Sequence, residues 1–513
     1  MSVFKSSRSN SARRKALRAL TICALLSIPW HTANSQESAP NAGANNVTAL
    51  RASLLASVGP TIDSRLAALG GETRIGVAVV DGNTGKLLFE RNAQDGFVAA
   101  SNAKLVTTAA ALALLGPEFT FRTELLGEGV KPQGNVPGNL YIRGRGNSLF
   151  DDADMARLVR RLRALGVTRI DGQIVVDNSY FDTHNLPPHF DEQPTEQAAF
   201  RAPIAATSYN FNSFALYVRP SLSGSGATRI EVRPPNDYVK VINTSQTVRT
   251  GRSLLRMDTT EEPTRLRIAL SGQLHNGVVR RRFRKRVPDP VKFVGSGLAR
   301  ALTDAGIAVR KKAITAGAAP SDAQVLATHE SPPLATAVRG MGKYSNNFIA
   351  ELLLKVIGAE VNAAGAPATW QHGTSAVQEF LKTVGIAPGT YRYENGSGLF
   401  DSNQFSPLQL TTLLAFAHRH PRWGSEFFSS LSIAGIDGTL SRRMDASDAE
   451  GLVRAKTGTL AQASALSGLA AIDGRRPVFF SILVNDFDES NIGIARALQD
   501  EIAQELIRAL SGR

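Results

Sequence analysis

Three short motifs, far apart and in one order, constrain this chain more than any other feature of its sequence. S-x-x-K, S-x-N and K-T-G together supply a nucleophile, its base, a proton relay and a clamp for a carboxylate, without a histidine. The fold must therefore bring together two motif serines that lie more than two hundred positions apart. The motifs are Ser101-Asn102-Ala103-Lys104, Ser345-Asn346-Asn347 and Lys456-Thr457-Gly458-Thr459.

The order of the motifs matters because two of them have second copies. S-x-x-K also occurs at Ser2-Val3-Phe4-Lys5 and S-x-N at Ser208-Tyr209-Asn210, whereas K-T-G occurs once. The first extra copy lies in an N-terminal segment that cannot be catalytic. The second leads into residues 211–218, which resemble a strand more than a helix start. We therefore assign the two serines of the site to Ser101 and Ser345.

The residues around Ser101 favour a nucleophile at the start of a helix. Residues 76–89 predict a strand, a turn and a second strand, and a helix is predicted to follow until Gly116-Pro117. Free N–H groups in the first turn of that helix favour an oxyanion. Lys104 lies on the same face as Ser101, and partial burial would lower its pKa enough for the neutral amine to take the serine proton. An isolated match would instead be a capping serine beside an exposed lysine.

The second motif directly precedes an apolar helical run, 348–354. A loop at the start of a helix can present a hydroxyl and an amide close together. We predict that Ser345 relays a proton to the leaving amine, and that Asn347 holds both the substrate amide and Lys104. The alternative is that Ser345 is only the N-cap of the helix.

The third motif lies on a predicted strand, and two further strand-like runs follow it. A strand bordering a cleft can pair with an extended peptide, and Gly458 allows the backbones to approach closely. Lys456 and the hydroxyls of Thr457 and Thr459 are predicted to bind a terminal carboxylate. The amides of Ser101 and Thr459 are predicted to form the oxyanion hole.

With these motifs the chain resembles the penicillin-binding serine acyl-transferases. It closely resembles one branch, the D-alanyl-D-alanine carboxypeptidase/endopeptidase family (class C low-molecular-mass penicillin-binding proteins), whose mark is a long insertion between the first two motifs. The resemblance implies an α/β, penicillin-binding transpeptidase-like domain with a central antiparallel sheet and flanking helices, split by a mainly β insertion. Further similar stretches are Val80-Asp81, Thr84-Gly85, Gly138 to Gly144, Phe200-Arg201-Ala202-Pro203 and Asn395-Gly396-Ser397-Gly398-Leu399.

The resemblance also implies a reaction. Ser101 attacks the carbonyl between two D-alanines of a peptidoglycan stem peptide, the terminal residue leaves, and water releases the acyl-enzyme; β-lactam antibiotics are expected to acylate the same serine. No cofactor is needed, and eight histidines without a Cys/His spacing indicate no metal site. A β-lactamase and a non-catalytic envelope-binding protein are the alternatives. The long insertion argues against the first, and the intact motifs argue against the second.

Three positions concern the side chain of the diamino acid in the stem peptide. Phe400-Asp401 stands where family members often have a serine-arginine pair, and Ala461 stands where several have glutamine. Some members place an acidic residue shortly before the Phe-x-Ala-Pro segment, and Glu196 is the candidate here. Asp401 and Glu196 are therefore candidate substrate-binding residues. The alternative for Asp401 is that it caps the following turn.

The N-terminal residues predict a secretory signal. Six basic residues precede an apolar stretch, 19–30, and Ala33-Asn34-Ser35 has small residues suited to cleavage. The single cysteine, Cys23, lies within that stretch, after a residue too large for a lipoprotein signal. We expect an exported, periplasmic protein without a disulfide, a lipid anchor or a transmembrane segment after cleavage. An uncleaved anchor is the weaker alternative, because the run is short and contains Pro29.

The charge distribution argues against nucleic acid as a partner. The formal net charge is +14, and six of the positive charges lie in the predicted signal, where no acidic residue occurs. The densest basic run, 280–286, contains one aromatic residue, Phe283. It could bind an anionic envelope polymer, but strand alternation would place only half of it on one face. We predict a solvated strand face.

Composition divides the chain into successive regions. From about residue 124, Gly, Pro and Asn recur between short β-like runs, and helical patterning returns after Val287-Pro288-Asp289-Pro290. A helix predicted at 49–69 is expected to break at Gly59-Pro60, and another is expected at 492–510. The predicted regions are a signal peptide (1–35), a first catalytic part (36–124), an inserted mainly β region (125–290) and a second catalytic part (291–513).

Overall fold

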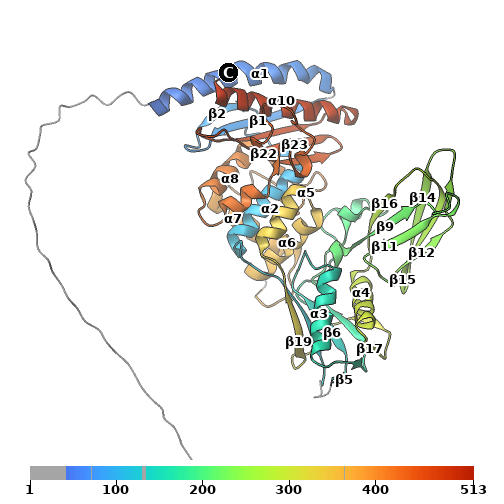
Figure 1. Cartoon of the computed structure of the whole chain (residues 1–513). Coiled ribbons are helices and arrows are strands. Elements are labelled where there is room, and N and C mark those ends of the chain that lie inside the picture. Colours follow the sequence, from blue (N-terminus) through green and yellow to red (C-terminus); the bar gives the residue numbers. More distant parts are fainter. Residues whose placement is uncertain (1–41, 71, 130–133, 363, 513) are drawn as a thin grey trace, which may run out of the picture. The chain divides into compact units, whose positions relative to one another are not determined.

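The computed structural model describes residues 42–70, 72–129, 134–362 and 364–512 (Figure 1). The predicted signal peptide lies outside the described residues. Among the residues that are described, no helix combines the length and apolar character needed to cross a bilayer.

A six-stranded antiparallel sheet joins segments from both ends of the described chain. Its order is β2-β1-β24-β23-β22-β21, and β1 pairs with β24 along its whole length. The turn predicted after β1 is present: the Asp81 carboxylate accepts hydrogen bonds from the N–H groups of Asn83 and Thr84 over 3.1 and 2.8 Å. The strands are β1 (Arg74–Asp81), β2 (Leu87–Arg91), β21 (Ser432–Ile433), β22 (Val453–Leu460), β23 (Ala463–Ala470) and β24 (Val478–Asn485).

Two helices, α1 (Ala42–Leu69) and α10 (Ile492–Ser511), cover one face of this sheet (Figure 1). Side chains such as Leu54 and Leu506 share an apolar core with the strands. The helix predicted at 492–510 is thus confirmed. The break predicted at Gly59-Pro60 is wrong, since α1 continues through Pro60. Apolar residues before and after the proline are buried against the sheet, which outweighs the backbone hydrogen bond that proline cannot make.

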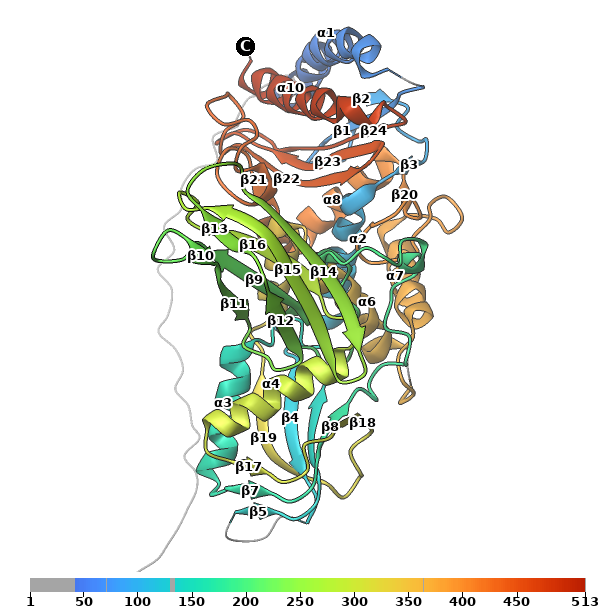
Figure 2. The ribbon, with the colours of Figure 1, turned by 90° about the vertical axis from the view of Figure 1, so that its right-hand side faces the viewer.

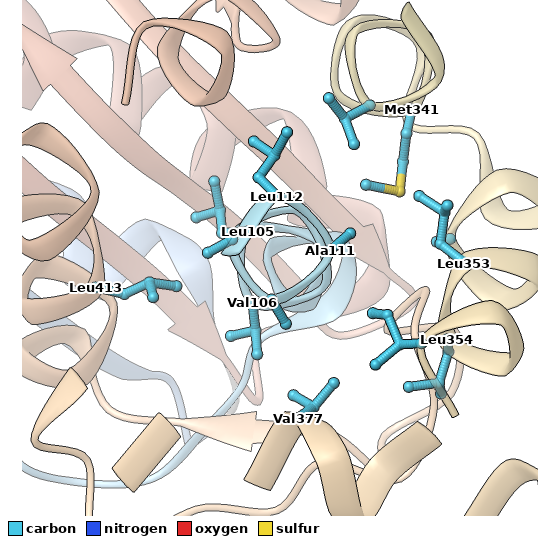
Figure 3. Close-up of a cluster of buried hydrophobic side chains, with 14 of the residues drawn as sticks. Leu105, Val106, Ala111, Leu112, Met341, Leu353, Leu354, Val377 and Leu413 are labelled. Carbon is cyan, nitrogen blue, oxygen red and sulfur yellow. The ribbon is translucent and has the colours of Figure 1, made fainter. Parts of the chain in front are cut away.

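Helix α2 (Ala103–Leu115), which contains Lys104, lies at the centre of the core on the other face. Its Ala- and Leu-rich sequence favours a helix, and it ends before Gly116 as predicted. Four further helices surround it: α5 (Leu334–Tyr344), α6 (Asn347–Val361), α7 (Trp370–Val384) and α8 (Pro407–Arg419). Figure 3 shows Leu105, Val106, Ala111 and Leu112 of α2 facing Met341, Leu353, Leu354, Val377 and Leu413.

Between α2 and α5 the chain forms smaller sheets (Figure 2). One has the order β18-β8-β6-β4-β19, and a short one has the order β17-β7-β5. Two others have the orders β11-β9-β16 and β10-β13-β15-β12, with β14 paired to β15. These sheets share an apolar core with α3 (Asp152–Ala164) and α4 (Pro290–Asp304).

Strand pairing in this region crosses the predicted limits of the insertion. Strands β18 and β19 follow residue 290, yet they pair with β8 and β4. The limits at 125 and 290 stay a prediction. The strands are β4 (Arg122–Gly127), β5 (Asn135–Val136), β6 (Leu140–Gly144), β7 (Arg169–Ile170), β8 (Ile174–Asp177), β9 (Ser213–Arg219), β10 (Gly226–Ala227), β11 (Arg229–Arg233), β12 (Val239–Asn243), β13 (Gln246–Val248), β14 (Leu254–Glu262), β15 (Arg265–His275), β16 (Arg281–Arg286), β17 (Ala308–Val309), β18 (Ile314–Ala316) and β19 (Gln324–Glu330).

Candidate active site

The first motif lies where a short 3₁₀ turn, Ala100–Asn102, runs into α2. Ser101 is half-buried, whereas Lys104 is 1% exposed. The Lys104 amine donates a hydrogen bond to Ser101 Oγ, with 2.9 Å between nitrogen and oxygen. A separation of three residues is nearly one helical turn, so the side chains of Ser101 and Lys104 lie on the same side of the helix. The structure thus places the predicted base next to the predicted nucleophile.

The environment of Lys104 makes its amine a proton acceptor near neutral pH. Burial lowers its pKa to about 7, and the negative charge of Glu351 opposes that shift. The second hydrogen bond of the amine goes to the neutral carbonyl of Ser397. Near neutral pH, a large fraction of the free protein therefore has an unprotonated Lys104 that can accept the Ser101 proton.

Glu351 and Ser397 contribute to this arrangement although they lie outside the three motifs. Glu351, on α6, is 1% exposed and accepts hydrogen bonds from the N–H groups of Gly396 and Ser397 over 3.1 and 2.9 Å. Burial raises the pKa of its carboxyl, while these bonds and Lys104 oppose the rise. Glu351 thus holds the turn whose carbonyl binds Lys104. The only signal in the sequence is one acid within the apolar run 348–354.

Two glycines allow other backbone segments to approach the nucleophile turn. A Cβ on Gly398, which has a φ of 70°, would lie 1.9 Å from the carbonyl oxygen of Ala100. A Cβ on Gly458 would lie 3.0 Å from the Ala99 oxygen and 3.1 Å from the Ala100 Cβ. Strand β22 therefore passes directly beside the turn that contains Ser101.

The second motif joins the end of α5 to the start of α6. Ser345 has left-handed backbone angles, φ 53° and ψ 41°. The N-cap of α6 is Asn346, whose side chain accepts a hydrogen bond from the N–H of Ile349 over 3.2 Å. The alternative that Ser345 is this cap is therefore wrong. Its hydroxyl instead accepts a hydrogen bond from the Lys456 amine over 2.8 Å.

Asn347 makes a different contact from the one expected. Its side-chain amide donates a hydrogen bond to the carbonyl of Phe200 over 3.4 Å. Within the described residues, no hydrogen bond joins it to Lys104. The predicted contact of Asn347 with a substrate amide stays a prediction.

Lys456 links the second and third motifs. It is 1% exposed and donates hydrogen bonds to Ser345 Oγ and to the Thr457 carbonyl, the latter over 2.7 Å. Burial lowers its pKa well below the ordinary value, and the positive charge of Lys104 adds to the shift. Its own carbonyl accepts a hydrogen bond from the Asn102 side chain over 3.1 Å. The site therefore contains two neighbouring lysine–serine pairs, both with easily deprotonated amines.

The outer edge of β22 is open at the third motif. Strand β21 pairs with β22 only before the motif, so among the described strands residues 456–460 pair with β23 alone. The hydroxyl of Thr457 donates to that of Thr439 over 2.8 Å, and the Thr459 hydroxyl accepts a bond from Arg496 over 3.3 Å. An extended peptide can add to such an edge.

Asp401 and Glu196 lie near one cluster of aromatic rings around Arg201. The Arg201 guanidinium is 5.1 and 5.0 Å from the ring centres of Phe190 and Phe400. Exposed Asp401 follows Phe400, and the charge of Glu196 acts on Arg201. Among the described residues, neither carboxylate hydrogen-bonds to a motif side chain. Their predicted contact with substrate stays a prediction.

The serine of the second S-x-N copy, Ser208, forms hydrogen bonds that stabilise the local fold. Ser208 is buried, donates a hydrogen bond to the Ala205 carbonyl over 2.6 Å and accepts one from Asn212 over 3.0 Å. In the part of the chain that the structure describes, no group of three or more His, Cys, Asp or Glu side chains is placed to hold a metal ion.

Comparisons with known proteins agree with this arrangement. The D-alanyl-D-alanine carboxypeptidase of Actinomadura sp. (strain R39) is 32% identical over 406 residues, covering 77% of this chain and 74% of that protein. The crystal structure of penicillin binding protein 4 (dacB) from Haemophilus influenzae has a TM-score of 0.71 and 23% identity, covering 86% of this chain and 99% of that chain. The same protein complexed with a β-lactam has a TM-score of 0.68 and 24% identity over 86% and 97% of the two chains.

The structural likeness confirms the penicillin-binding fold that the sequence implied. A family model described as the D-Ala-D-Ala carboxypeptidase 3 (S13) family matches residues 60–506, which include all three motifs. This chain belongs to the D-Ala-D-Ala carboxypeptidase 3 (S13) family.

Proposed function

We propose that this protein is a serine-type D-Ala-D-Ala carboxypeptidase/endopeptidase that acts on peptidoglycan stem peptides through an acyl-enzyme on Ser101. The observation that carries the proposal is the pair formed by Ser101 Oγ and the Lys104 amine, 2.9 Å apart, with the pKa of the lysine lowered to about 7. A nucleophile and a base within hydrogen-bonding distance are the requirement for serine acyl transfer.

Acylation begins when neutral Lys104 takes the proton of Ser101 Oγ as this oxygen attacks the carbonyl between two D-alanines. The amides of Ser101 and Thr459 stabilise the resulting oxyanion. Ser345, hydrogen-bonded to Lys456, relays a proton to the leaving amine. The peptide C–N bond breaks, D-alanine leaves, and the acyl group remains on Ser101.

Deacylation uses water as the second nucleophile. Water attacks the ester carbonyl and gives its proton to Lys104, the ester C–O bond breaks, and Ser101 recovers its proton. The products are the shortened stem peptide and the regenerated enzyme. Glu351 takes no part in bond making but holds the turn that binds Lys104.

The third motif binds the end of the substrate. The open edge of β22 pairs with the extended peptide, and Lys456 with Thr457 and Thr459 binds the terminal carboxylate. Because burial depresses the pKa of Lys456, arrival of a carboxylate raises that pKa and restores the ammonium charge. Asn347 contacts the substrate amide. Asp401 and Glu196 contact the side chain of the diamino acid.

This activity places the protein in the cell envelope. The signal-like residues 1–35 direct export to the periplasm and are then removed. β-Lactams resemble the D-Ala-D-Ala end and acylate Ser101 without a rapid release. Retention of the penicilloyl group separates this function from that of a β-lactamase, which must hydrolyse its acyl-enzyme quickly.

Labelling with penicillin tests the proposal. Mass spectrometry should place the covalent adduct on the peptide that contains Ser101, and Ser101→Ala should abolish labelling. Ser208→Ala, in the other S-x-N copy, is the matched control and should label normally. An adduct on Ser208, or no adduct on the intact folded protein, would contradict the assignment. Digestion of cell-wall fragments then identifies the released products, free D-alanine from ends or separated peptides from cross-links.

A further inference from the structure

Three segments between β9 and β16 form a region that the catalytic site does not use. They are residues 219–229, 247–256 and 273–282, here called the basic tip. The segments lie at the ends of strands β9, β13, β14, β15 and β16, and Figures 1 and 2 both show β9, β14, β15 and β16 side by side.

The basic tip exposes unusually large aliphatic side chains. Val279, Leu222 and Leu254 have exposed fractions of 86%, 85% and 75%. They are the three most exposed aliphatic side chains among the large hydrophobic residues that the structure describes; the next is Leu165 at 60%. Exposed aliphatic residues that gather at one place indicate an interaction site, whereas single ones need no explanation.

Strand register brings Val279 and Leu222 to the same end of one sheet. Strand β16 runs antiparallel to β9 with Arg281 opposite Val218. Val279, two residues before Arg281, therefore lies level with the residues that follow β9. Leu222 is three residues past the end of β9.

Leu254 reaches the same end from the neighbouring sheet. It pairs with Gln273 of β15, just before the turn that leads to β16. The loops themselves are close, because a Cβ on Gly224 would lie 3.6 Å from Asn276 Nδ2 and 3.8 Å from Arg249 Nε. The three aliphatic residues thus belong to one surface.

The charge of the tip has a single sign. Its three segments contain eight arginines and no aspartate or glutamate. Seven of the arginines are exposed, and of the eight only Arg219 forms an ion pair among the described residues, with Glu231 at 2.7 Å. Arg280, Arg281 and Arg282 at this end of β16 are exposed, and the prediction that the run only faces solvent stays a prediction. The arginines are Arg219, Arg229, Arg249, Arg252, Arg256, Arg280, Arg281 and Arg282.

We propose that the basic tip docks on a lipid bilayer that contains anionic phospholipids. The arginines bind headgroup phosphates, and Leu222, Leu254 and Val279 enter the boundary between headgroups and acyl chains. Binding of this kind combines buried apolar area with attraction to anionic lipid. A soluble polyanion would use the arginines, but it would leave the three aliphatic side chains in water. The aliphatic residues therefore favour a membrane as the partner.

Vesicle binding of the chain that remains after removal of residues 1–35 tests this docking. The protein should bind vesicles of phosphatidylglycerol and phosphatidylcholine at least about 100-fold more tightly than phosphatidylcholine alone. A variant with Arg249→Gln, Arg252→Gln and Arg280→Gln should bind the anionic vesicles about 100-fold more weakly, because each arginine near the surface contributes about a factor of five. A variant with Leu222→Ser, Leu254→Ser and Val279→Ser should lose about tenfold or more.

Matched substitutions elsewhere in the chain separate docking from general charge or hydrophobicity. A variant with Arg310→Gln, Lys311→Gln and Lys312→Gln removes three exposed cations outside the tip, and Leu165→Ser removes an exposed leucine. Both should change vesicle binding less than about twofold. Every variant lacks residues 1–35, whose basic and apolar residues would themselves bind anionic vesicles, and should still react with penicillin, which reports correct folding.

A tryptophan reports insertion directly. The fluorescence emission of Leu222→Trp should shift to shorter wavelength on addition of anionic vesicles, whereas that of Leu165→Trp should not. The proposal is overturned if the serine variant binds as tightly as the unchanged protein, since the three aliphatic side chains would then not enter the bilayer and the arginines alone would account for binding. It is also overturned if neutral and anionic vesicles bind equally, or if the emission of the Leu222→Trp variant does not change.

Discussion

Basic side chains gather in two regions of this molecule that differ in burial. Lys104 and Lys456 in the active site are each 1% exposed, and burial lowers the pKa of both. In the basic tip, arginines such as Arg252 and Arg280 are exposed to water. Burial converts a cation into a group that can exchange a proton, whereas exposure leaves a fixed charge that salt can screen.

Replacing the buried lysine Lys104 by arginine, the residue that carries the charge of the basic tip, gives the largest expected effect. Lys104→Arg places a permanent charge where the proposed mechanism needs a proton acceptor. The rate of acylation by penicillin should fall about 1,000-fold or more, as measured by mass spectrometry of the adduct over time. Lys86→Arg changes an exposed lysine beside the β1–β2 turn and should keep the rate. If Lys104→Arg acylates within about tenfold of the unchanged protein, another group is the base.

The pH dependence of acylation is the next test of the buried lysine. With a pKa of about 7, Lys104 is mainly protonated below that pH and neutral above it. Only a neutral amine can accept the Ser101 proton, so the acylation rate should rise about tenfold per pH unit well below 7, by about 50-fold from pH 5 to 7, and then level off about twofold higher. A profile with its midpoint above pH 9 would mean that Lys104 keeps the pKa of an exposed lysine.

Removal of the second buried lysine should have a smaller and more selective effect. Lys456→Ala removes the group that we propose pairs with the substrate carboxylate, so kcat/KM for peptides with a free terminal carboxylate should fall by at least about tenfold, or ~1.4 kcal/mol. Peptides with an amidated terminus provide the comparison, because Lys456 also binds Ser345. Equal losses for both kinds of peptide would assign Lys456 to the proton relay rather than to the carboxylate. Lys382→Ala, an exposed lysine on α7, is the control.

The sequence predicted those parts of the molecule that depend on local pattern. Ser101 and Lys104 are three residues apart on one helix, so their contact follows from helix geometry. Alternation and turn residues located β1, β2 and β23. The family resemblance supplied the central sheet, because periodicity alone does not fix the order of strands.

The parts that were missed depend on contacts between distant residues. Glu351 binds the backbone of a turn 45 positions later, and nothing in its own helix indicates that partner. The side chain of Asn347 bonds to Phe200 rather than Lys104, since the path of the insertion brings that carbonyl to it. Pro60 was expected to end a helix by local preference, and burial on the sheet outweighed that preference. Tertiary packing decides all three.

Asp401 offers the smallest expected effect, because its charge is neither buried nor part of a cluster. Its carboxylate makes no hydrogen bond among the described residues. The alternative that Asp401 caps the following turn requires such a hydrogen bond and is therefore not supported. If it faces the stem peptide, it repels a free carboxylate on a diaminopimelate-type side chain and favours an amidated form. Asp401→Arg should then shift the ratio of kcat/KM toward the free acid about threefold to fivefold, the range of an exposed charge pair.

Two further substitutions help to interpret the change in the kcat/KM ratio of Asp401→Arg. Asp401→Asn removes the charge without adding one, so its ratio should lie between those of the unchanged protein and Asp401→Arg. Glu196→Gln removes the other carboxylate near the Arg201 cluster and should shift the ratio in the same direction if both face the substrate side chain. Because salt screens exposed charges, these shifts should shrink at high ionic strength, whereas the loss in Lys456→Ala should persist. A ratio that is unchanged in Asp401→Arg at low salt would remove Asp401 from substrate recognition.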